Sequence, residues 1–390
     1  MHFSELGLSP ALLSAIQRAN YDTPYPIQVE AIPALLQKKD VLGLAPTGSG
    51  KTAAYILPIL QQLLQQEAPR DRQVPVLVLV PTRELAVQVV EVAENFSRFL
   101  PRRIKSLAIF GGVSINPQMM KLGGTEILIA TPGRLIDLVG RNAVGIGRIQ
   151  TLVIDEADKM LQMGFREEMD HLLELLPKKK QTLLFSATED KEVAELIQQL
   201  LKDPVRIQVA ASDFTPELIH QEAYRVSPEE KGPFLRKLIQ SGDWAQILIF
   251  TSSIRTADNL TVKLNKNGIQ AAAFHGDKSQ GARTEALAKF KSGKTRVLVA
   301  TDLAARGIDI QGLPLVINYE LPRSPKDYIH RIGRTGRAGA AGQAISLITV
   351  EEQHHFKVIQ KKMGKWVTLV PAEAFGKPAE EAEQASESVD

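Results

Sequence analysis

The stretch Val41-Leu-Gly-Leu-Ala-Pro-Thr-Gly-Ser-Gly-Lys-Thr52 decides the fold. Val41–Leu44 is an apolar run that predicts a buried strand, a glycine-rich turn follows it, and Ala53–Leu64 has the pattern of a helix. The backbone N–H groups of such a turn and the positive end of the helix can bind phosphate. The sequence therefore predicts a phosphate-binding loop made of Ala45, Pro46, Thr47, Gly48, Ser49, Gly50, Lys51 and Thr52.

Two side chains of this loop are expected to bind a nucleotide. Lys51 is expected to reach the β- and γ-phosphates, and the Thr52 hydroxyl is expected to hold Mg²⁺. The strict Walker A pattern has glycine where Ala45 stands. The strand before the loop and the helix after it nevertheless favour a phosphate site over an accidental glycine-rich turn.

A second stretch, from Ala288 to Thr295, repeats the Ala-x4-Gly-Lys-Thr skeleton in the opposite context. A helical pattern precedes it and the strand pattern Arg296–Ala300 follows it. Gly293 is therefore interpreted as the glycine that ends a helix. We expect one nucleotide site, in the first half of the chain.

Short apolar runs alternate with helical patterns along both halves, which is typical of βαβ units and parallel sheets. The runs do not alternate with polar residues, as expected for strands covered on both faces. Further strands are predicted at Val76–Val80, Ile127–Ala130, Thr151–Ile154, Leu183–Phe185, Ile247–Phe250, Gln270–Phe274, Val297–Ala300, Leu315–Ile317 and Ala344–Ile348. The pattern predicts an α/β fold in which the two halves are copies of one plan.

Length and composition set further limits. A chain of 390 residues favours two domains, and the absence of cysteine excludes disulfides and thiolate metal sites. No run approaches 18 apolar residues, and the N-terminus lacks a signal-peptide pattern, so a cytoplasmic protein without a membrane span is expected. Six acidic residues and one lysine fall in 371–390, a net −5, so the remainder carries +8 against a total of +3. This acidic tail is expected to be disordered.

An acidic segment follows the strand Thr151–Ile154. Asp155 at the end of this strand can hold a metal through water, and Glu156 beside it can orient or deprotonate an attacking water. Such a segment alone would suit a surface turn equally well. Its pairing with a phosphate loop favours hydrolysis of a nucleotide.

The segment from His330 to Arg337 places three arginines, Arg331, Arg334 and Arg337, within eight residues. Arginines stabilise the charge that builds on a transferred phosphoryl group, although a solvated basic loop would look the same. The second half has no phosphate loop of its own. We therefore expect these arginines to act on the nucleotide of the first half, so that catalysis requires the halves to close.

These motifs, in this order, resemble the DEAD-box family of RNA helicases within helicase superfamily 2. The resemblance covers about 3–370, and the opening of the chain is similar to bacterial members, with the RhlE-like branch suggested. Asp155–Asp158 spells Asp-Glu-Ala-Asp. The other matching segments are Pro81–Leu85, Gly111–Gly112, Thr131–Arg134, Ser186–Thr188, Gln280 with Arg283, Ala300–Asp302, Ala305–Asp309 and His330–Arg337. The resemblance implies two tandem RecA-like domains, each a mostly parallel sheet flanked by helices.

The resemblance also implies an adenine-reading element near the N-terminus. Phe3, Tyr21, Pro24, Ile27 and Gln28 fit its pattern, whereas Asn20 and Tyr25 replace the usual glycine and threonine. The Gln28 amide would pair with the adenine edge, since an amide both donates and accepts, and Tyr21 would stack on the base. The implied boundaries are 1–29 for this segment, 30–208 and 218–370 for the domains, 209–217 for the linker and 371–390 for the tail.

The family roles, carried over to this sequence, assign ATP and Mg²⁺ as cofactors. Lys51, Glu156, Arg334 and Arg337 would be catalytic, Thr52 and Asp155 would hold the metal, Arg306 would lie against adenine and Asp309 would reach the ribose. Asp158, Ser186, Thr188 and His330 would couple ATP to RNA and domain closure. RNA would be contacted by Arg83, Gly112, Thr131, Arg134, Gln280, Arg283 and Thr301. Such contacts go mostly to phosphates and sugar hydroxyls, so they carry little sequence specificity.

Three functions are compatible with these residues. The first is RNA-stimulated ATP hydrolysis that separates short RNA duplexes or remodels RNA–protein complexes. The second is an ATP-gated RNA clamp or assembly factor with little strand separation, and the third, a DNA helicase, is disfavoured by the Asp-Glu-Ala-Asp string together with Gln28. A monomer is expected, and ribosomal precursors and RNA-decay complexes are the candidate partners. The sequence leaves the RNA target and the pathway open.

Overall fold

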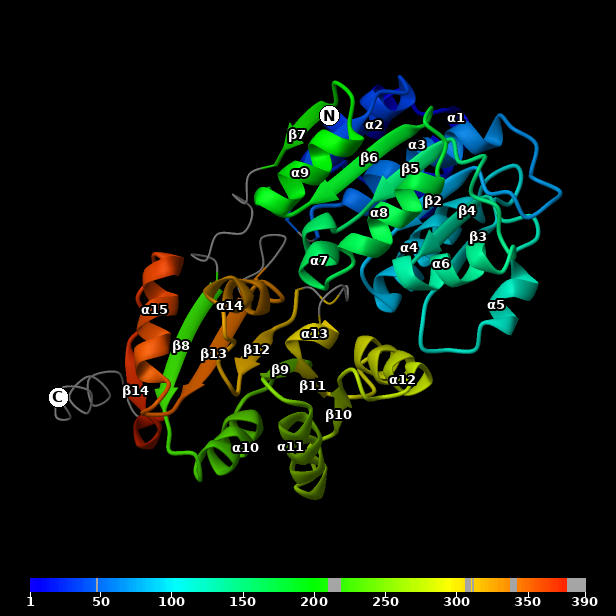
Figure 1. The fold of residues 1–390 in the computed structure, drawn as a ribbon. Helices are drawn as coiled ribbons and strands as arrows, with labels where there is room; N and C mark the ends of the chain where they lie inside the picture. Colours follow the sequence, from blue (N-terminus) through cyan, green and yellow to red (C-terminus); the bar gives the residue numbers. More distant parts are fainter. Residues whose placement is uncertain (47, 210–218, 306–309, 311, 337–341, 377–390) are drawn as a thin grey trace. The chain divides into compact units, whose positions relative to one another are not determined.

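The computed structural model describes residues 1–46, 48–209, 219–305, 310, 312–336 and 342–376. The chain divides into two compact units, Met1–Ala211 and Ser212–Asp390 (Figure 1). Each unit has its own sheet and its own apolar core, and each is described by itself below.

The first unit is a seven-stranded sheet in the order β3-β4-β2-β5-β6-β1-β7, with parallel pairing throughout. The strands are β1 (Val41–Leu44), β2 (Val76–Leu79), β3 (Ser106–Ile109), β4 (Ile127–Ala130), β5 (Thr151–Ile154), β6 (Gln181–Ser186) and β7 (Val205–Gln208). The helices are α1 (Pro10–Arg18), α2 (Pro26–Leu36), α3 (Lys51–Leu64), α4 (Arg83–Ser97), α5 (Asn116–Lys121), α6 (Pro132–Gly140), α7 (Ala157–Gln162), α8 (Arg166–Leu175) and α9 (Lys191–Leu200).

The second unit is also a seven-stranded parallel sheet, in the order β10-β11-β9-β12-β13-β8-β14. Its strands are β8 (Ile219–Arg225), β9 (Ile247–Thr251), β10 (Ala271–Phe274), β11 (Val297–Thr301), β12 (Leu315–Asn318), β13 (Gly342–Ile348) and β14 (Leu369–Pro371). Its helices are α10 (Lys231–Ser241), α11 (Ile254–Lys266), α12 (Gln280–Lys291), α13 (Asp302–Ala305), α14 (Pro325–Ile332) and α15 (Gln353–Met363).

The two sheets have one topology. When the seven strands of each unit are numbered in chain order, both sheets have the order 3-4-2-5-6-1-7. The predicted α/β plan, repeated in the two halves, is therefore confirmed. The phosphate-loop pattern occurs after the first strand of the first unit, at the carboxyl end where ligands bind in open parallel sheets.

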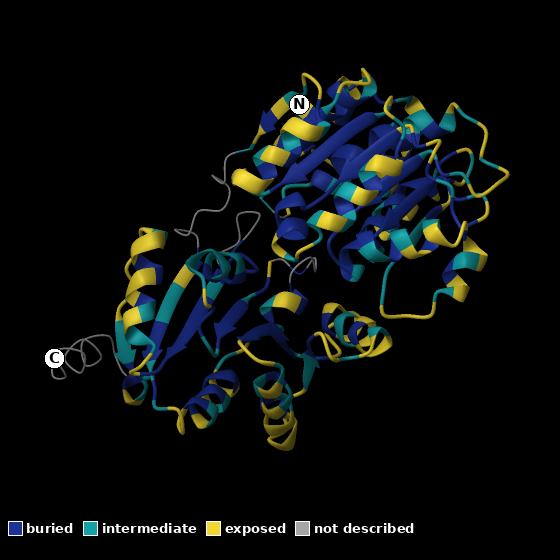
Figure 2. Cartoon of the chain, viewed as in Figure 1, coloured by how far each residue is buried: buried dark blue, intermediate teal, exposed yellow. Residues whose placement is uncertain are grey.

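Alternate residues of the central strands enter opposite cores, so both faces of each sheet are covered (Figure 2). In β1, Val41 packs with α1, α2, α3 and α4, whereas Leu42 packs with α6, α7, α8 and α9. In the second unit, α10 and α11 cover one face, and α12, α13, α14 and α15 share the other. This burial explains why most of the strands are continuous apolar runs.

Four strands were missed by the sequence patterns. They are β3, β7, β8 and β14, which lie at or near the edges of the two sheets. Their residues are less buried than those of the central strands; β7, for example, has one buried residue among four. An exposed strand face does not require an apolar side chain, so these strands lack the predicted signal.

The expected domain boundaries need three corrections. Helix α2 spans the boundary placed at 29, so the first segment is part of the first unit. Val209 is not linker, because its N–H donates to the Leu44 carbonyl at 2.9 Å and its side chain packs on the first core. The tail prediction was wrong for 371–376, since Phe375 packs edge-on against Tyr224 and Phe234. Residues 210–217 and 377–390 lie outside the described part of the chain.

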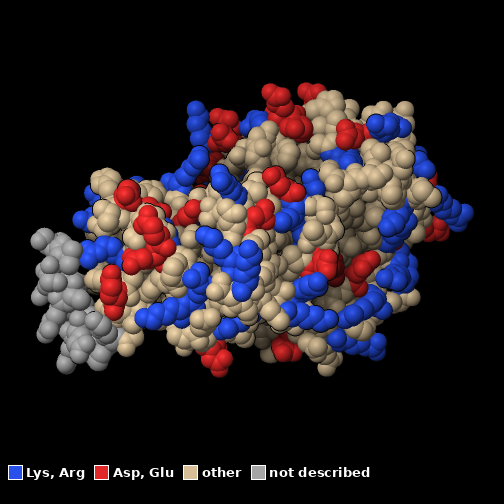
Figure 3. Space-filling view, turned by 90° about the horizontal axis from the view of Figure 1, so that it is seen from below, with Lys and Arg blue, Asp and Glu red and all other residues tan. Residues whose placement is uncertain are grey.

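Two further properties of the chain concern its helices and its surface charge. Among the described residues, no helix is both long and apolar enough to cross a membrane. Lys and Arg side chains are numerous on the face drawn in Figure 3, with Asp and Glu side chains between them.

Candidate functional site

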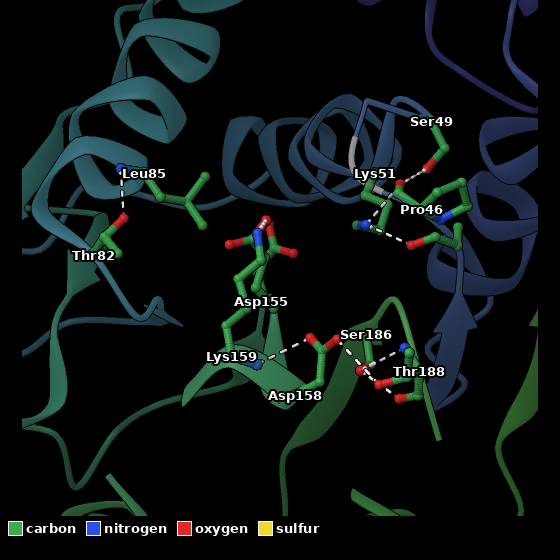
Figure 4. Close-up of polar contacts among 12 residues, drawn as sticks. Pro46, Ser49, Lys51, Thr82, Leu85, Asp155, Asp158, Lys159, Ser186 and Thr188 are labelled. Atoms are coloured by element: carbon green, nitrogen blue, oxygen red, sulfur yellow. Dashed lines mark hydrogen bonds and ion pairs between the residues drawn. The ribbon is translucent and has the colours of Figure 1, made fainter. Parts of the chain in front are cut away.

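The predicted phosphate loop joins β1 to α3, as the sequence indicates. Gly48 and Gly50 have φ of 83° and 87°, a backbone conformation that glycine adopts at little cost. Lys51 begins α3 and is buried, and its ammonium donates to the carbonyls of Ala45 at 2.7 Å and Pro46 at 2.9 Å (Figure 4). The ammonium of Lys51 thus binds backbone carbonyls of the same loop. An entering phosphate would offer the same ammonium charged acceptors, which form stronger hydrogen bonds.

The adenine-reading segment is joined to this loop through Gln28. Its side chain is buried, accepts from the Tyr25 N–H at 3.0 Å and donates to the Gly50 carbonyl at 3.0 Å. A Cβ added at Gly50 would lie 2.5 Å from the Gln28 amide nitrogen and 3.0 Å from the Tyr25 ring. Tyr21 packs edge-on against Phe96, with 5.0 Å between ring centroids. Recognition of adenine by Gln28 and Tyr21 stays a prediction, and Thr47 lies outside the described residues.

The acidic segment begins where β5 ends, and its first carboxylate is linked to α3. Asp155 is buried, and its Oδ2 accepts a hydrogen bond from the Tyr55 hydroxyl at 2.9 Å. Burial raises the pKa of Asp155 to about 6, and nearby Lys51 opposes this shift. Burial also lowers the pKa of Lys51, and Asp155 opposes that shift in turn. The two groups therefore partly neutralise each other inside the first unit.

Glu156 and Asp158 have different partners. Glu156 lies in the left-handed region at φ 56°, ψ 48°, and its Oε1 accepts from the Lys159 ammonium at 2.6 Å. Asp158 accepts from the Thr188 hydroxyl at 3.2 Å and from the backbone N–H of Lys159 at 3.0 Å. Three buried carboxylates of one segment are thus held by a phenol, an ammonium and a hydroxyl. Different surroundings allow neighbouring carboxylates to have different roles.

The Asp158–Thr188 bond extends into the end of β6. The Ser186 hydroxyl donates to the Thr188 carbonyl at 2.7 Å and accepts from the Thr188 N–H at 3.3 Å (Figure 4). The predicted coupling residues Asp158, Ser186 and Thr188 are therefore brought together. His330, the fourth of them, lies in α14 of the second unit.

The chemistry of the loop and the acidic segment fits Mg²⁺. The Oδ1 atom of Asp155 is buried and has no hydrogen-bond partner among the described residues. No group of three or more His, Cys, Asp or Glu suited to a metal occurs in that part of the chain. Mg²⁺ usually takes one or two protein carboxylates together with substrate phosphates and water, so one open carboxylate oxygen beside a phosphate loop suits it.

The expected RNA contacts of the first unit gather at the carboxyl edge of the sheet. The Arg83 guanidinium lies against Gly112, where an added Cβ would be 2.1 Å from Nη2. Arg134 donates to the carbonyl of Val113, the next residue, at 2.8 Å, and its Nη1 is buried with no hydrogen-bond partner among the described residues. Thr131 precedes α6, which carries Arg134. Two arginines and a glycine turn thus lie together beyond β2, β3 and β4.

The expected RNA contacts of the second unit follow adjacent strands. Gln280 and Arg283 are in the first turn of α12, and Arg283 lies over the Phe274 ring at 5.2 Å from its centroid. Phe274 ends β10, and Thr301 ends the neighbouring β11. The carboxyl ends of these parallel strands meet at one sheet edge, so the three residues share that edge.

The arginines of the arginine-rich segment differ in their surroundings. Arg331 is almost fully buried and pairs with both Asp302 oxygens, at 2.6 and 2.7 Å, and it also donates to the side chain of Asn318 at 3.1 Å. The expectation that all three arginines act on nucleotide was therefore wrong for Arg331, because its guanidinium binds side chains of the second unit. Arg334 is also buried, with its carbonyl bonded to the Leu313 N–H at 3.1 Å. Arg306, Asp309 and Arg337 lie outside the described residues.

The second Gly-Lys-Thr stretch is not a phosphate loop. Gly293 has φ 74° and follows the end of α12, and the Thr295 N–H donates to the Lys289 carbonyl at 3.1 Å. Strand β11 then begins at Val297. The prediction of a helix-ending glycine is confirmed.

Two residues of the site were missed in the sequence. Tyr55 is four residues after Lys51, so both lie on one face of α3. Lys159 is three residues after Glu156, a spacing at which side chains on a helix can meet. Both spacings were present in the sequence, but neither residue type signals nucleotide chemistry alone.

Comparisons with known proteins identify the family of this chain. The DEAD/DEAH box helicase model matches 25–196, and the helicase conserved C-terminal domain model matches 230–339. The DEAD-box ATP-dependent RNA helicase CshA of Streptococcus pneumoniae is 42% identical over 92% of this chain and 68% of its own length. The ATP-dependent RNA helicase DeaD of Escherichia coli is 38% identical over 96% of this chain and 60% of its own.

Solved structures show the same likeness. Dbp5 of S. cerevisiae bound to RNA and ADP BeF3 has a TM-score of 0.83 and 31% identity, covering 100% of this chain and 99% of its own. A DEAD box protein from Methanococcus jannaschii has a TM-score of 0.54 and 35% identity, covering 94% and 98%. Together with the phosphate loop and the acidic segment at the edge of one parallel sheet, these matches establish that the chain belongs to the DEAD/DEAH box helicase family, with a tandem RecA-like fold.

Proposed function

We propose that this protein is an ATP-dependent RNA helicase that hydrolyses ATP when RNA is bound. The observation that carries the proposal is the Tyr55–Asp155 hydrogen bond, because it ties the helix of the phosphate loop to the acidic strand end. Relatives of similar sequence are named ATP-dependent RNA helicases, and a similar structure is bound to RNA and ADP BeF3.

The first unit would supply most of the hydrolytic groups. Lys51 would leave the loop carbonyls for the phosphates, and Thr52 and Asp155 would hold Mg²⁺, which supplies charge stabilisation to the phosphates when bound. Glu156 would take a proton from water as the water oxygen bonds to the γ-phosphorus. The bond from that phosphorus to the β-phosphate oxygen breaks, and ADP leaves with the electron pair.

Recognition of the rest of the nucleotide follows the family pattern. Gln28 and Tyr21 would bind adenine, with Arg306 against the base and Asp309 at the ribose. Arg334 and Arg337 would stabilise the charge of the transferred phosphoryl group, which makes the second unit necessary for hydrolysis.

RNA would be held by its backbone. Arg83, Arg134 and Arg283 bring positive charge to two sheet edges, where phosphates are the matching partner. Gly112 lets the chain approach closely beside Arg83, and Thr131, Gln280 and Thr301 can bond to phosphate or sugar oxygens. Because contacts to phosphate and sugar do not distinguish one base from another, low sequence specificity is expected.

Coupling between ATP and RNA would run through Asp158, Thr188 and Ser186. Their hydrogen bonds connect the acidic segment with the end of β6, so a change at the nucleotide can shift both. His330 would join them from the second unit when the domains close. Closure on ATP would bend a bound strand and expel its complement, and hydrolysis would then release the RNA.

The cellular setting is also a proposal. We propose a monomeric cytoplasmic protein that acts on ribosomal precursors or RNA-decay complexes, since backbone contacts suit many RNAs. Crosslinking of RNA to a Glu156→Gln protein in cells would identify the targets.

A hydrolysis assay tests the proposal. Glu156→Gln should bind Mg·ATP and single-stranded RNA as the wild type does, but its turnover should fall about 10²–10⁴-fold, the usual scale for loss of a general base. Glu167→Gln makes the same change at an exposed residue of α8 and should turn over normally. Normal turnover by Glu156→Gln would exclude the assigned role.

A strand-displacement assay separates the helicase from the RNA clamp. With a short labelled RNA duplex, repeated ATP-dependent displacement by the wild type is the helicase result. Glu156→Gln should displace at most one strand per protein molecule, because release of the RNA requires hydrolysis. ATP hydrolysis without displacement would instead support the clamp. Equal stimulation of hydrolysis by DNA and RNA would favour a DNA helicase.

A further inference from the structure

Glu156 is held by a buried cation from its own segment. The Lys159 ammonium lies 2.6 Å from Oε1 of Glu156, and both side chains are less than one-tenth exposed. Ion pairs between residues three apart are common on helix surfaces, where water screens them and they contribute little. This pair is shielded from water, so its two members are strongly dependent on each other.

The backbone adds to the constraint on Glu156. Its left-handed φ and ψ are unusual for a residue with a side chain, and such conformations persist where the surrounding structure enforces them. Glu156 stands just before α7, and Lys159 is in the first turn of that helix. Backbone and ion pair together restrict where the carboxylate can lie.

Glu156 is the one carboxylate of its segment that pairs with an ammonium in the described structure. Asp155 is bonded to the Tyr55 hydroxyl, and Asp158 to the Thr188 hydroxyl. Lys51, the other buried ammonium nearby, is engaged with the phosphate loop. Lys159 is therefore a buried cation placed to orient the Glu156 carboxylate.

We propose that Lys159 is a positioning residue, which holds the Glu156 carboxylate through one oxygen in the orientation that accepts a proton from the attacking water. The inference rests on the proposed role of Glu156 as the general base. A carboxylate held through one oxygen can still accept a proton at the other, and a small displacement of such a group is costly to the rate. Lys159 itself would touch neither ATP nor water.

Lys159→Met tests this inference because it removes the cation and keeps an unbranched apolar chain. We expect kcat for hydrolysis of saturating Mg·ATP with saturating poly(U) RNA to fall about tenfold or more. The affinity for Mg·ADP, measured by titration calorimetry, should stay within about twofold of wild type, since Lys51 and its loop are unchanged. A purely structural role would instead lower binding and thermal stability, with kcat per folded molecule unaltered.

A double-mutant cycle makes the test specific for Glu156. In a Glu156→Gln background, Lys159→Met should cause little additional loss of kcat, because the carboxylate that it positions is already gone. An equal loss in both backgrounds would overturn the inference. Residual activity of Glu156→Gln near the wild-type level would instead remove the proposed general base, so the two failures are distinguishable.

A matched control uses another lysine–glutamate pair. Lys231 in α10 is equally buried and lies 2.8 Å from Glu352, far along the chain from the acidic segment. Lys231→Met should lower thermal stability but leave kcat within about twofold of wild type. A loss of kcat equal to that of Lys159→Met would show that any broken buried pair has this effect, and would overturn the inference.

Lys159→Gln covers the case in which Lys159→Met does not fold. Its amide can still donate to Glu156 but ends about one atom short of the ammonium position. A positioning role predicts reduced kcat at unchanged Mg·ADP affinity. Wild-type kcat in this variant would overturn the inference.

Discussion

The hydroxyl of Tyr55 donates a hydrogen bond to Oδ2 of Asp155 at 2.9 Å, which joins the helix of the phosphate loop to the strand end that carries the acidic segment. Burial raises the pKa of Tyr55 well above its ordinary value, so the phenol remains a donor at any physiological pH. The bond leaves Oδ1 of Asp155 as the oxygen available to a metal. Tyr55 thus orients the proposed metal ligand from the element that also carries Lys51.

Tyr55→Phe should weaken Mg²⁺ binding. The change removes a bond that favours the ionised Asp155 and leaves a buried acceptor unsatisfied, at a cost of about 1–3 kcal/mol. We expect a higher Mg²⁺ concentration for half-maximal ADP binding and for half-maximal hydrolysis. Tyr328→Phe, which changes a buried tyrosine of the second unit, is the control. An unchanged Mg²⁺ requirement would show that Asp155 does not depend on the phenol.

Arg337→Ala should abolish most hydrolysis. An arginine that stabilises the transferred phosphoryl group is worth on the order of 10³-fold or more in kcat. The measurement is RNA-stimulated phosphate release, with Arg323→Ala, a change at an exposed arginine, as the control. Turnover near that of the wild type would mean that Arg337 does not act on the transferred phosphoryl group.

Lys294→Ala should leave nucleotide binding intact, whereas Lys51→Ala should lose it. Lys294 follows the glycine that ends α12, and no phosphate loop surrounds it, while Lys51 begins the helix after such a loop. Titration of both variants with Mg·ADP distinguishes the two Gly-Lys-Thr stretches. Weakened binding in Lys294→Ala would mean that the second stretch contributes to the site.

Asp302→Asn should destabilise the second unit by about 3–5 kcal/mol, because it leaves the buried Arg331 charge without its bidentate partner. Thermal or urea unfolding measures this loss. The joint change Asp302→Asn with Arg331→Met removes the uncompensated charge, so it should recover part of the stability. Equal stability of the single variant and the wild type would show that the stability of the unit does not depend on the Asp302–Arg331 ion pair.

The described part of the C-terminal segment should contribute to stability. A chain that ends at Gly376 keeps Phe375 on Tyr224 and Phe234, whereas one that ends at Val370 loses those aromatic contacts. The shorter chain should be less stable by on the order of 1–3 kcal/mol, and the longer one should unfold like the full chain. A lower unfolding temperature for the chain ending at Gly376 would instead assign stability to 377–390.

Central strands were predictable because both of their faces are covered. Val76–Leu79 is a continuous apolar run, and so are the first four residues of Ile247–Thr251. Strands that are buried on both faces need apolar side chains on both faces. The strand Ile219–Arg225 was missed, since only its first, fifth and sixth residues are buried and the others can be polar. Such a strand near the edge of a sheet is recognised by its pairing with neighbouring strands, which the linear sequence does not show.

The residues of the candidate site were predictable where they fall within one short sequence motif. Lys51, Asp155 and Thr188 fall in short segments whose residue types carry the chemistry. The bonds of Asp155 to Tyr55 and of Asp158 to Thr188 join segments that are distant in sequence, so their geometry depends on the folded sheet. Arg331 shows the opposite case, because its residue type suggested catalysis while its surroundings make it structural.

The position of β1 in its sheet has a consequence for synthesis on the ribosome. Val41 emerges early, but it pairs with Leu183 of β6 on one side and Val205 of β7 on the other. Pairings between residues so far apart in sequence form late in folding. The phosphate loop is therefore synthesised early, but the strands that pair with β1 and hold the loop in place are synthesised last. Nucleotide affinity should appear abruptly, when the last strand of the unit has left the exit tunnel.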